Sequence, residues 1–248
     1  MKHFSKLTFI TVGILLSALF IQSCTNDNDD ISIYYPNALV TVKHADDNTL
    51  FLQLDAETTL LPKNLAKSPF GDKEVRALVN FSELDEESNG YSKAVHINWI
   101  DSILTKKTVS FSEDLEIDKI YGTDPVEIVN DWVTIAEDSY LTLRFRTRWG
   151  YTHKPHFVNL ISGVNPENPY EVEFRHNAYG DIYGNAGDAL AAFSLKDLPD
   201  TNGETVKLKL TWMSFSGKKS VEFDYNTNKE TKGSLSLQNE NNFIQAIK

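Results

Sequence analysis

Three arginines alternate along one predicted strand of this chain, at Arg144, Arg146 and Arg148. Residues two apart on a strand point to the same face, so the three guanidinium groups form one row. Such a row could clamp carboxylates or sulfates on a ligand. The alternative, which we favour, is a ladder of ion pairs with carboxylates on neighbouring strands. The acids considered for that ladder, or for pairing with Lys207 and Lys209, are Glu171, Glu173, Glu222 and Asp224.

An aromatic loop follows the arginine strand and contains Trp149, Tyr151, His153 and His156. Aromatic rings on a rigid sheet scaffold can stack on sugar rings, which makes Trp149 and Tyr151 candidate ligand contacts beside the arginines. Alternatively, Trp149 plugs the end of the core and Tyr151 covers it. The two histidines make a poor metal site, because Pro155 breaks helical geometry and no third ligand is near. We expect no metal here.

The sequence offers no recognisable catalytic pattern. Segment 179–188 carries acids and glycines, but it lacks the closing glutamate of a calcium loop and the Gly-Lys-Ser/Thr ending of a phosphate loop. No Gly-x-Ser-x-Gly elbow is present. Glu171 and Glu173 lie side by side on one strand, whereas a glycosidase needs two carboxylates facing each other across a cleft. We therefore predict a protein that is not an enzyme and needs no cofactor.

Cys24 is the only cysteine of the chain, so it cannot form an internal disulfide. It follows a basic start and an apolar run at 7–21, the pattern of a secretory signal peptide over 1–23. The residues IQS at 21–23 fit a bacterial lipobox, which predicts lipidation of Cys24 and a membrane anchor made of acyl chains. The alternative is an ordinary signal peptide with an incidental cysteine.

Net charge limits the partners. The chain carries a formal charge of −11, and removal of residues 1–23, which contain two lysines and no acid, takes the mature chain to −13. Nucleic acids and anionic lipid surfaces attract clustered Lys and Arg. The net negative charge of the mature chain therefore argues against nucleic acid as a partner.

Segment 33–123 predicts a small β-barrel domain. It holds five short stretches with alternating or β-branched apolar residues, separated by turn signals. This pattern is typical of an OB-like barrel, and closure leaves fewer unpaired strand edges. The domain boundary is placed near Asp124-Pro125, which favours an extended turn. The predicted strands cover 38–43, 50–54, 58–62, 73–81 and 94–104.

Segment 124–226 predicts an antiparallel β-sandwich, followed by a polar tail at 227–248. Along 141–149, Leu141, Leu143 and Phe145 share a face with Thr147 and Trp149, while Thr142 and the arginines share the opposite, solvent-facing side. One buried and one wet face is typical of antiparallel sheets, and six or seven such strands fit a sandwich. The predicted strands cover 131–136, 141–149, 156–164, 170–175, 206–212 and 221–225, the last with Val221, Phe223 and Tyr225 buried. Segment 187–194 is read as a strand or a short helix.

Seven blocks of residues are spread over nearly the whole mature chain: YPNALVTVK at 35–43, ETTLLP at 57–62, RALVNF at 76–81, WIDSILTK at 99–106, DPVE at 124–127, LTLRF at 141–145 and HKPH at 153–156. In these blocks the chain resembles the NigD-like lipoproteins of Bacteroidales. The resemblance implies an OB-like domain followed by a β-sandwich. The founding member is linked to a bacteriocin locus, which implies an immunity or accessory role. No catalytic residue of the family is carried over to this chain.

The segment behind Cys24 predicts where the protein is displayed. Residues 24–32 are polar and acidic, as expected of a disordered tether, and they resemble the surface-export signal of Bacteroidetes lipoproteins. We expect a lipid anchor in the outer membrane with display on the cell surface; a plain solvated spacer is the alternative. The leading interpretation is a binding or bacteriocin-immunity protein with an unknown partner. The alternative is a glycan-binding lipoprotein of an outer-membrane uptake system.

Overall fold

The computed structural model describes residues 34–114, 116–152 and 154–227. The predicted signal peptide, Cys24, the tether at 24–32 and the predicted tail, except for Thr227, lie outside these ranges. The described chain is built from strands, with one short helix, α1 (Ile117–Tyr121). The all-β prediction is therefore confirmed.

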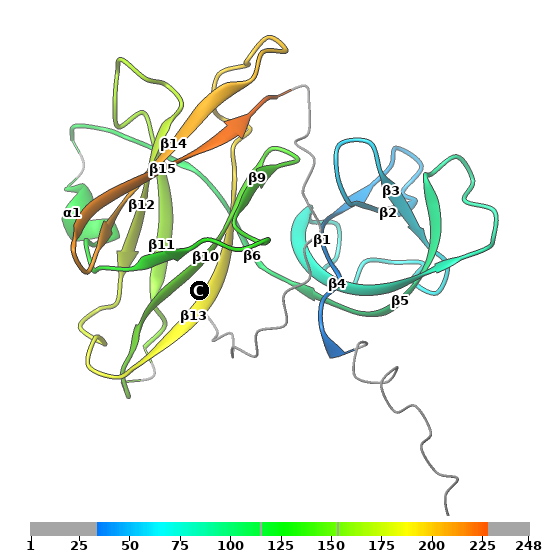
Figure 1. The fold of residues 1–248 in the computed structure, drawn as a ribbon, viewed down its shortest axis with the longest axis horizontal. Coiled ribbons are helices and arrows are strands. Elements are labelled where there is room, and N and C mark those ends of the chain that lie inside the picture. The colour runs from blue at the N-terminus through cyan, green and yellow to red at the C-terminus, as the bar shows by residue number, and fades with distance from the viewer. Residues whose placement is uncertain (1–33, 115, 153, 228–248) are drawn as a thin grey trace, which may run out of the picture. The chain divides into compact units, whose positions relative to one another are not determined.

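The first part of the described chain is a closed five-stranded barrel (Figure 1). Around the barrel the strand order is β1-β2-β3-β5-β4, and β4 pairs with β1 to close it. β3 and β5 run parallel, whereas the other neighbours are antiparallel. All five predicted strands are present, and the OB-like barrel is confirmed. The strands are β1 (Ala38–His44), β2 (Leu50–Gln53), β3 (Thr59–Pro62), β4 (Val75–Leu84) and β5 (Lys93–Ser102).

The barrel closes around the apolar residues that alternate along its strands. Val40 and Val42 of β1, Leu52 of β2 and Leu60 of β3 are all fully buried in one cluster. A register shift between Asn80 and Phe81 of β4 lets that long strand bend around the barrel.

The second part is a sandwich of two five-stranded sheets (Figure 1). Leu143 and Phe145 of the first sheet and Leu160 and Phe174 of the second belong to one buried core. The first sheet has the order β6-β13-β10-β8, with β9 also paired to β10, and the second has the order β15-β14-β12-β11-β7. The first-sheet strands are β6 (Leu104–Lys107), β8 (Glu127–Val129), β9 (Ile135–Glu137), β10 (Tyr140–Trp149) and β13 (Asn185–Ser194). The second-sheet strands are β7 (Val109–Ser110), β11 (Phe157–Ser162), β12 (Glu171–Asn177), β14 (Val206–Ser214) and β15 (Gly217–Tyr225).

The boundary predicted near Asp124 differs from the structure. β6 pairs in parallel with β13, and β7 pairs in parallel with β11, so residues 104–110 belong to the sandwich and not to the barrel. β12 and β14 are parallel as well, so the sandwich is antiparallel only in part. A parallel partner lies far away in the sequence, and for this reason local alternation did not reveal these pairings.

Along β10 and β15 the strand faces follow the prediction except at Thr142 and Val221. Leu141, Leu143, Phe145 and Thr147 are buried as expected. Thr142 was predicted to face solvent but is fully buried, because the barrel covers that end of β10. Val221 was predicted to be buried but is 38% exposed on β15, which is an edge strand.

The barrel and the sandwich belong to one compact unit that begins at Pro36, and a buried arginine joins them. Arg76 of β4 is completely buried. Its guanidinium donates to Thr41 Oγ1 in the barrel at 2.9 Å and to Thr142 Oγ1 in the sandwich at 3.3 Å. It also forms an ion pair with Glu137 of β9. We call this group of four residues the junction.

A tight turn and an apolar cluster surround the junction. Asp138 and Ser139 have φ of 47° and 59° between β9 and β10, two consecutive left-handed residues as in a type I′ hairpin turn. Lys43 of β1 donates to Asp138 Oδ1 at 2.5 Å. The apolar contacts join Leu39, Leu78 and Ile103 to Val133, Leu190 and Ala192. The barrel is therefore packed onto the sandwich and not merely linked to it.

Candidate functional site

The arginine row is a ladder of ion pairs, but its partners differ from the predicted acids. Arg144 contacts Asp131 Oδ2 through Nη1 at 2.7 Å and Asp188 Oδ2 through Nη2 at 2.6 Å. Arg146 contacts Asp188 Oδ1 through Nε at 2.5 Å. Asp188 stands opposite Arg146 in the register of β10 with β13. The acids considered from the sequence lie on strands of the other sheet, where Glu171 contacts Lys209 and Asp224 contacts Lys207.

The charges of this ladder neutralise one another. Burial acts to raise the pKa of Asp188, but hydrogen bonds from Arg146 and Arg144 hold that pKa below its usual range. Arg148 is exposed and donates to the Gly184 carbonyl oxygen at 3.4 Å. The arginine row therefore ties β10 to its neighbours, and only Arg148 extends beyond the ion pairs.

Trp149 is built into the end of the sandwich. Its Nε1 donates to the Gly187 carbonyl oxygen at 3.0 Å. Its ring stacks on His156, with centroids 4.1 Å apart and planes 20° apart. Tyr151, by contrast, is 81% exposed and does not cover the core. The tryptophan matches the alternative predicted for it, while the tyrosine is free to meet a ligand.

Two histidines that the sequence did not pair lie behind this loop. His156 Nδ1 and His176 Nε2 are 2.9 Å apart, and both rings are buried. His176 Nδ1 lies 3.3 Å from the Asp124 carbonyl oxygen. A neutral His176 that donates to this carbonyl must accept from His156 at Nε2, which leaves His156 Nε2 unprotonated. Among the described residues that nitrogen has no hydrogen-bond partner, and it lies 3.5 Å from Asp181 Oδ2.

Burial keeps this histidine pair uncharged. Burial, followed by repulsion from His156, lowers the pKa of His176 to about 4. Burial also lowers the pKa of His156, against the attraction of Asp181. Within the described ranges, no group of three or more His, Cys, Asp or Glu is placed to hold a metal ion. His153 of the HKPH segment lies outside those ranges.

Asp181 fixes the loop after β10 against the turn after β12. Its Oδ2 accepts from the Gly150 amide at 3.0 Å, and its Oδ1 accepts from the Thr152 amide at 3.1 Å. Burial acts to raise the pKa of Asp181, but these hydrogen bonds hold it below the usual value. A Cβ on Gly184 would lie 1.5 Å from the Trp149 carbonyl oxygen, so glycine is required there. The two segments form one rigid rim.

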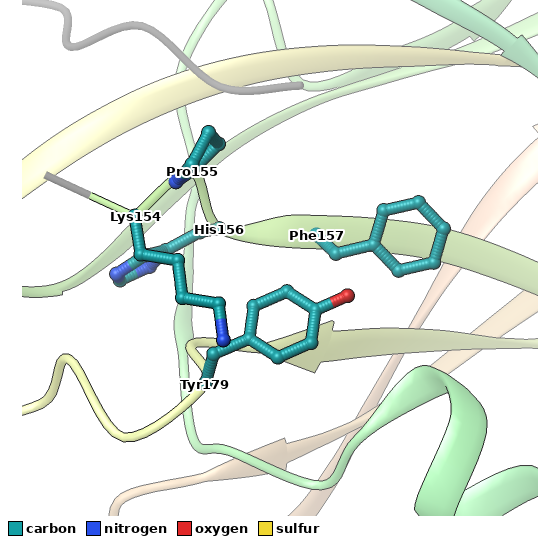
Figure 2. Close-up of a pocket in the computed structure, with 5 residues that line it drawn as sticks. All are labelled: Lys154, Pro155, His156, Phe157 and Tyr179. Atoms are coloured by element: carbon teal, nitrogen blue, oxygen red, sulfur yellow. The ribbon is translucent and has the colours of Figure 1, made fainter.

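A pocket opens beside this rim (Figure 2). Its volume is about 280 Å³, and it lies between the segment that enters β11 and the turn after β12. Figure 2 shows the Lys154 side chain extending toward Tyr179, with Phe157 beyond the tyrosine. We call this hollow the loop-end pocket. It is lined by Lys154, Pro155, His156, Phe157 and Tyr179.

Tyr179 holds an unusual backbone conformation at the pocket. Its φ is 52° and that of Gly180 is 84°, and the Asp181 amide donates to the Ala178 carbonyl oxygen at 3.0 Å. This is the pattern of a type I′ turn, in which Asn, Asp or Gly is usual and a bulky residue is an outlier. Strain of this kind costs of order 1–3 kcal/mol and is concentrated at functional sites.

The sequence identified one side of the site and missed the other. His156 was considered in the aromatic loop, but Lys154, Phe157 and Tyr179 were not singled out as ligand contacts. His176 lies on β12 and Tyr179 in the turn that follows β12. Both are far in sequence from the loop after β10, so local spacing could not connect them to it. The Tyr-Gly turn signal at 179–180 was the one available indication.

Two family models match this chain. A NigD-like N-terminal OB domain matches residues 39–103, and a NigD-like C-terminal beta sandwich domain matches residues 107–225. No curated protein matches the chain.

Solved structures of proteins from Parabacteroides and Bacteroides share the fold. A protein from Parabacteroides distasonis ATCC 8503 that carries a toxin-related name is 39% identical, with a TM-score of 0.65 over 77% of this chain and 93% of that one. A NigD-like immunity protein from Bacteroides caccae ATCC 43185 is 20% identical, with a TM-score of 0.54 over 76% of this chain and 96% of that one. A protein from Bacteroides fragilis NCTC 9343 that is named as a lipoprotein is 12% identical, with a TM-score of 0.52 over 77% and 99%. At these identities the last two show a shared fold and nothing further.

Proposed function

Because this chain belongs to the NigD-like family, we propose that it is a lipid-anchored protein of the cell envelope that acts by binding and not by catalysis. The observation that carries the anchor is the lone Cys24 placed directly after an apolar run and a small residue. The B. fragilis relative named as a lipoprotein supports the same assignment. Among the described residues, no helix is long and apolar enough to cross a membrane.

The proposed role is bacteriocin immunity or an accessory function that works through a bound partner. The B. caccae relative is named as an immunity protein, and the P. distasonis relative carries a toxin-related name. The sandwich chemistry favours binding over catalysis, because Asp188 is paired with two arginines and Asp181 accepts hydrogen bonds from two backbone amides. These carboxylates hold the fold together and are not poised for proton transfer.

The proposed location is the outer membrane, with display at the cell surface. The acidic residues at 27–30 directly behind Cys24 support this export route. The membrane is contacted through the acyl chains, and the folded part meets a protein or a glycan. A mature charge of −13 disfavours nucleic acid as a partner.

The anchor is tested by metabolic labelling with an alkyne fatty acid. The wild-type protein should take up label and fractionate with membranes, whereas Cys24→Ser should lose both properties. Ser23→Ala is the matched control, because it keeps a small residue before the cysteine and should remain labelled. A Cys24→Ser protein that still reaches the envelope unchanged would overturn the assignment.

The immunity role is tested by deleting the gene and challenging cells with bacteriocins from related strains. We expect the deletion to increase sensitivity to bacteriocin. The wild-type gene should restore resistance, and the Cys24→Ser gene should not. Crosslinking on intact cells, followed by recovery of the lipidated protein, should identify the partner. Unchanged sensitivity to every bacteriocin tested would count against immunity.

A second candidate function is glycan binding at the cell surface. It is favoured by three exposed tyrosines near the sandwich rim: Tyr151 at 81%, Tyr179 at 46% and Tyr183 at 86% exposure. Exposed aromatic rings on rigid loops suit stacking against sugars. A glycan array probed with the wild-type protein and with Tyr151→Ala tests this function, which fails if no glycan binds.

A further inference from the structure

The loop-end pocket has a charge pattern that sets it apart from the rest of the sandwich. Most sandwich cations face a carboxylate: Lys207 faces Asp224, Lys209 faces Glu171 and Arg175 faces Glu173. Lys154 is exposed, and within the described ranges no carboxylate pairs with it. Its Nζ lies instead over the Tyr179 ring, 4.1 Å from the centroid.

A second ammonium group lies close to the other ring of the pocket. Lys106 Nζ is 4.1 Å from the centroid of Phe157 and donates to the Val158 carbonyl oxygen and to Asn159 Oδ1. These acceptors are neutral, and no described carboxylate pairs with Lys106. Burial lowers the pKa of Lys106, as expected for a cation held without a counter-ion. An acidic protein therefore places two lysines, neither paired with a described carboxylate, on the Phe157 and Tyr179 rings of this pocket.

The other walls of the pocket suit a ring with one apolar face. Pro155 and Phe157 supply an apolar surface, and Tyr121 stacks on Phe157 at 6.5 Å, which supports that ring. The Tyr179 hydroxyl has no hydrogen-bond partner among the described residues, so it can bond to a ligand. The left-handed Tyr179 backbone keeps this hydroxyl and ring at the pocket despite the strain.

Size and charge narrow the class of ligand. Pockets for drug-sized ligands measure roughly 300–1,000 Å³, and about 280 Å³ suits one or two small rings rather than a long chain. Polyphosphates and nucleic acids need several clustered cations. Here Lys154 is the exposed cation, and Lys106 lies against the Phe157 ring. This arrangement suits a ligand with a single carboxylate.

We infer that the loop-end pocket binds an acidic sugar, with the sugar carboxylate on Lys154 Nζ and the apolar face of its ring on Phe157 and Pro155. The Tyr179 hydroxyl hydrogen-bonds a ring hydroxyl. This inference deepens the second candidate function, the binding of surface glycans, and rests on it.

The probe is a uronic-acid trisaccharide, trigalacturonate, of which one or two rings would enter the pocket, titrated calorimetrically into the detergent-purified mature lipoprotein. Its methyl ester keeps the rings and removes the charge, and acetate keeps the charge without the rings. We expect trigalacturonate to bind, and the ester and acetate to bind at least about tenfold more weakly, a difference of about 1.4 kcal/mol. Lys154→Ala should lose a similar factor, because among the described residues that line the pocket it removes the only exposed cation.

Lys67→Ala is the matched control, since Lys67 is an exposed barrel lysine without a described carboxylate partner. It should bind trigalacturonate like the wild type. Equal weakening by Lys67→Ala, or no weakening by Lys154→Ala, would overturn the pocket assignment in favour of diffuse charge attraction.

The remaining outcomes separate this inference from the proposed function. Equal binding of the methyl ester overturns the acidic class and leaves a neutral-glycan site. Absence of trigalacturonate binding at millimolar concentration, with neutral glycans still captured on an array, overturns the inference and keeps glycan binding. Absence of all glycan binding overturns both, while lipid labelling and bacteriocin challenge judge the anchor and immunity role independently.

Discussion

The junction and the loop-end pocket both contain a cation beside aromatic or hydroxyl groups, yet they treat the charge in opposite ways. At the junction, Arg76 is fully buried and meets Glu137 and two threonine hydroxyls. At the pocket, Lys154 is exposed, and the one described group that its ammonium contacts is the face of the Tyr179 ring. A charge that is paired with a counter-ion stabilises the structure, whereas a charge without a described counter-ion at a pocket remains available to a ligand. The contrast separates stability from recognition within one chain.

The largest expected effect breaks the junction. Arg76→Ala leaves the Glu137 carboxylate buried without its partner, which costs about 3–5 kcal/mol of the free energy of unfolding. Urea unfolding followed by tryptophan fluorescence measures this loss. The double variant Arg76→Met with Glu137→Leu removes both charges and should recover most of it. A double variant as unstable as the single one would show that the arginine acts through packing and not through its charge.

The next effect concerns the histidines behind the pocket, which the fold keeps uncharged. The pKa of His176 is lowered to about 4, against about 6.5 in an unfolded chain. Between these values the unfolded chain binds more protons, so the free energy of unfolding falls as pH falls from 6.5 toward 4. The full contribution, roughly 3 kcal/mol, is present above pH 6.5.

Chemical denaturation at neutral and acidic pH checks this dependence. Carboxylates elsewhere titrate too, so the informative quantity is the difference between the wild type and His176→Gln. The wild type should lose more stability on acidification than the variant does. Identical pH profiles would mean that the histidine pair is protonated in the folded protein.

A smaller effect tests the rim that supports the pocket. Gly184→Ala places a Cβ 1.5 Å from the Trp149 carbonyl oxygen, and the backbone shift that follows should cost about 1–3 kcal/mol and weaken ligand binding. Gly203→Ala is the control, because its Cβ meets nothing within 4 Å and only its positive φ opposes the change. It should lose less stability in thermal unfolding and keep full binding. The reverse order would place the rigid support elsewhere.

The smallest expected effect is a gain in stability rather than a loss. Tyr179→Asn relieves left-handed strain of order 1–3 kcal/mol and loses a cation–π contact of about 0.5–1 kcal/mol. We expect a net gain of about 1 kcal/mol in thermal unfolding, together with loss of trigalacturonate binding. Tyr183→Asn should change neither property appreciably, since Tyr183 is 86% exposed and has no left-handed backbone. Destabilisation by Tyr179→Asn would show that this tyrosine serves packing rather than recognition.

Alternation of apolar residues was sufficient to predict the five barrel strands and β10, β11, β12, β14 and β15 of the sandwich. It did not predict β8, and the strand predicted at 131–136 is mostly a turn that leads into β9. Leu141, Leu143 and Phe145 are buried because β10 is antiparallel to its neighbours and has one core-facing side. The burial of Thr142 was not predicted, because its side chain is covered by the barrel. A local sequence pattern does not show where a separate domain packs. β6 and β7 were not predicted either, because their parallel partners are far away in the chain.

The candidate site was less predictable than the fold. An ion-pair ladder at Arg144 and Arg146 was expected, but its partner Asp188 was not identified, although it lies in the segment 187–194 that was read as a strand or a short helix. Strand register decides which acid stands opposite which arginine, and sequence does not show register between distant strands. His156 and His176 meet across β11 and β12 for the same reason.

Ile103 alone separates β5 of the barrel from β6 of the sandwich, and its amide donates to the Arg76 carbonyl oxygen at 2.8 Å. The covalent path between the two halves thus has no slack in which a hinge could work. A force applied to the sandwich by a bound partner would therefore be transmitted directly to the barrel. We expect the barrel and the sandwich to move as one rigid body, so that rotation of one against the other does not regulate partner binding.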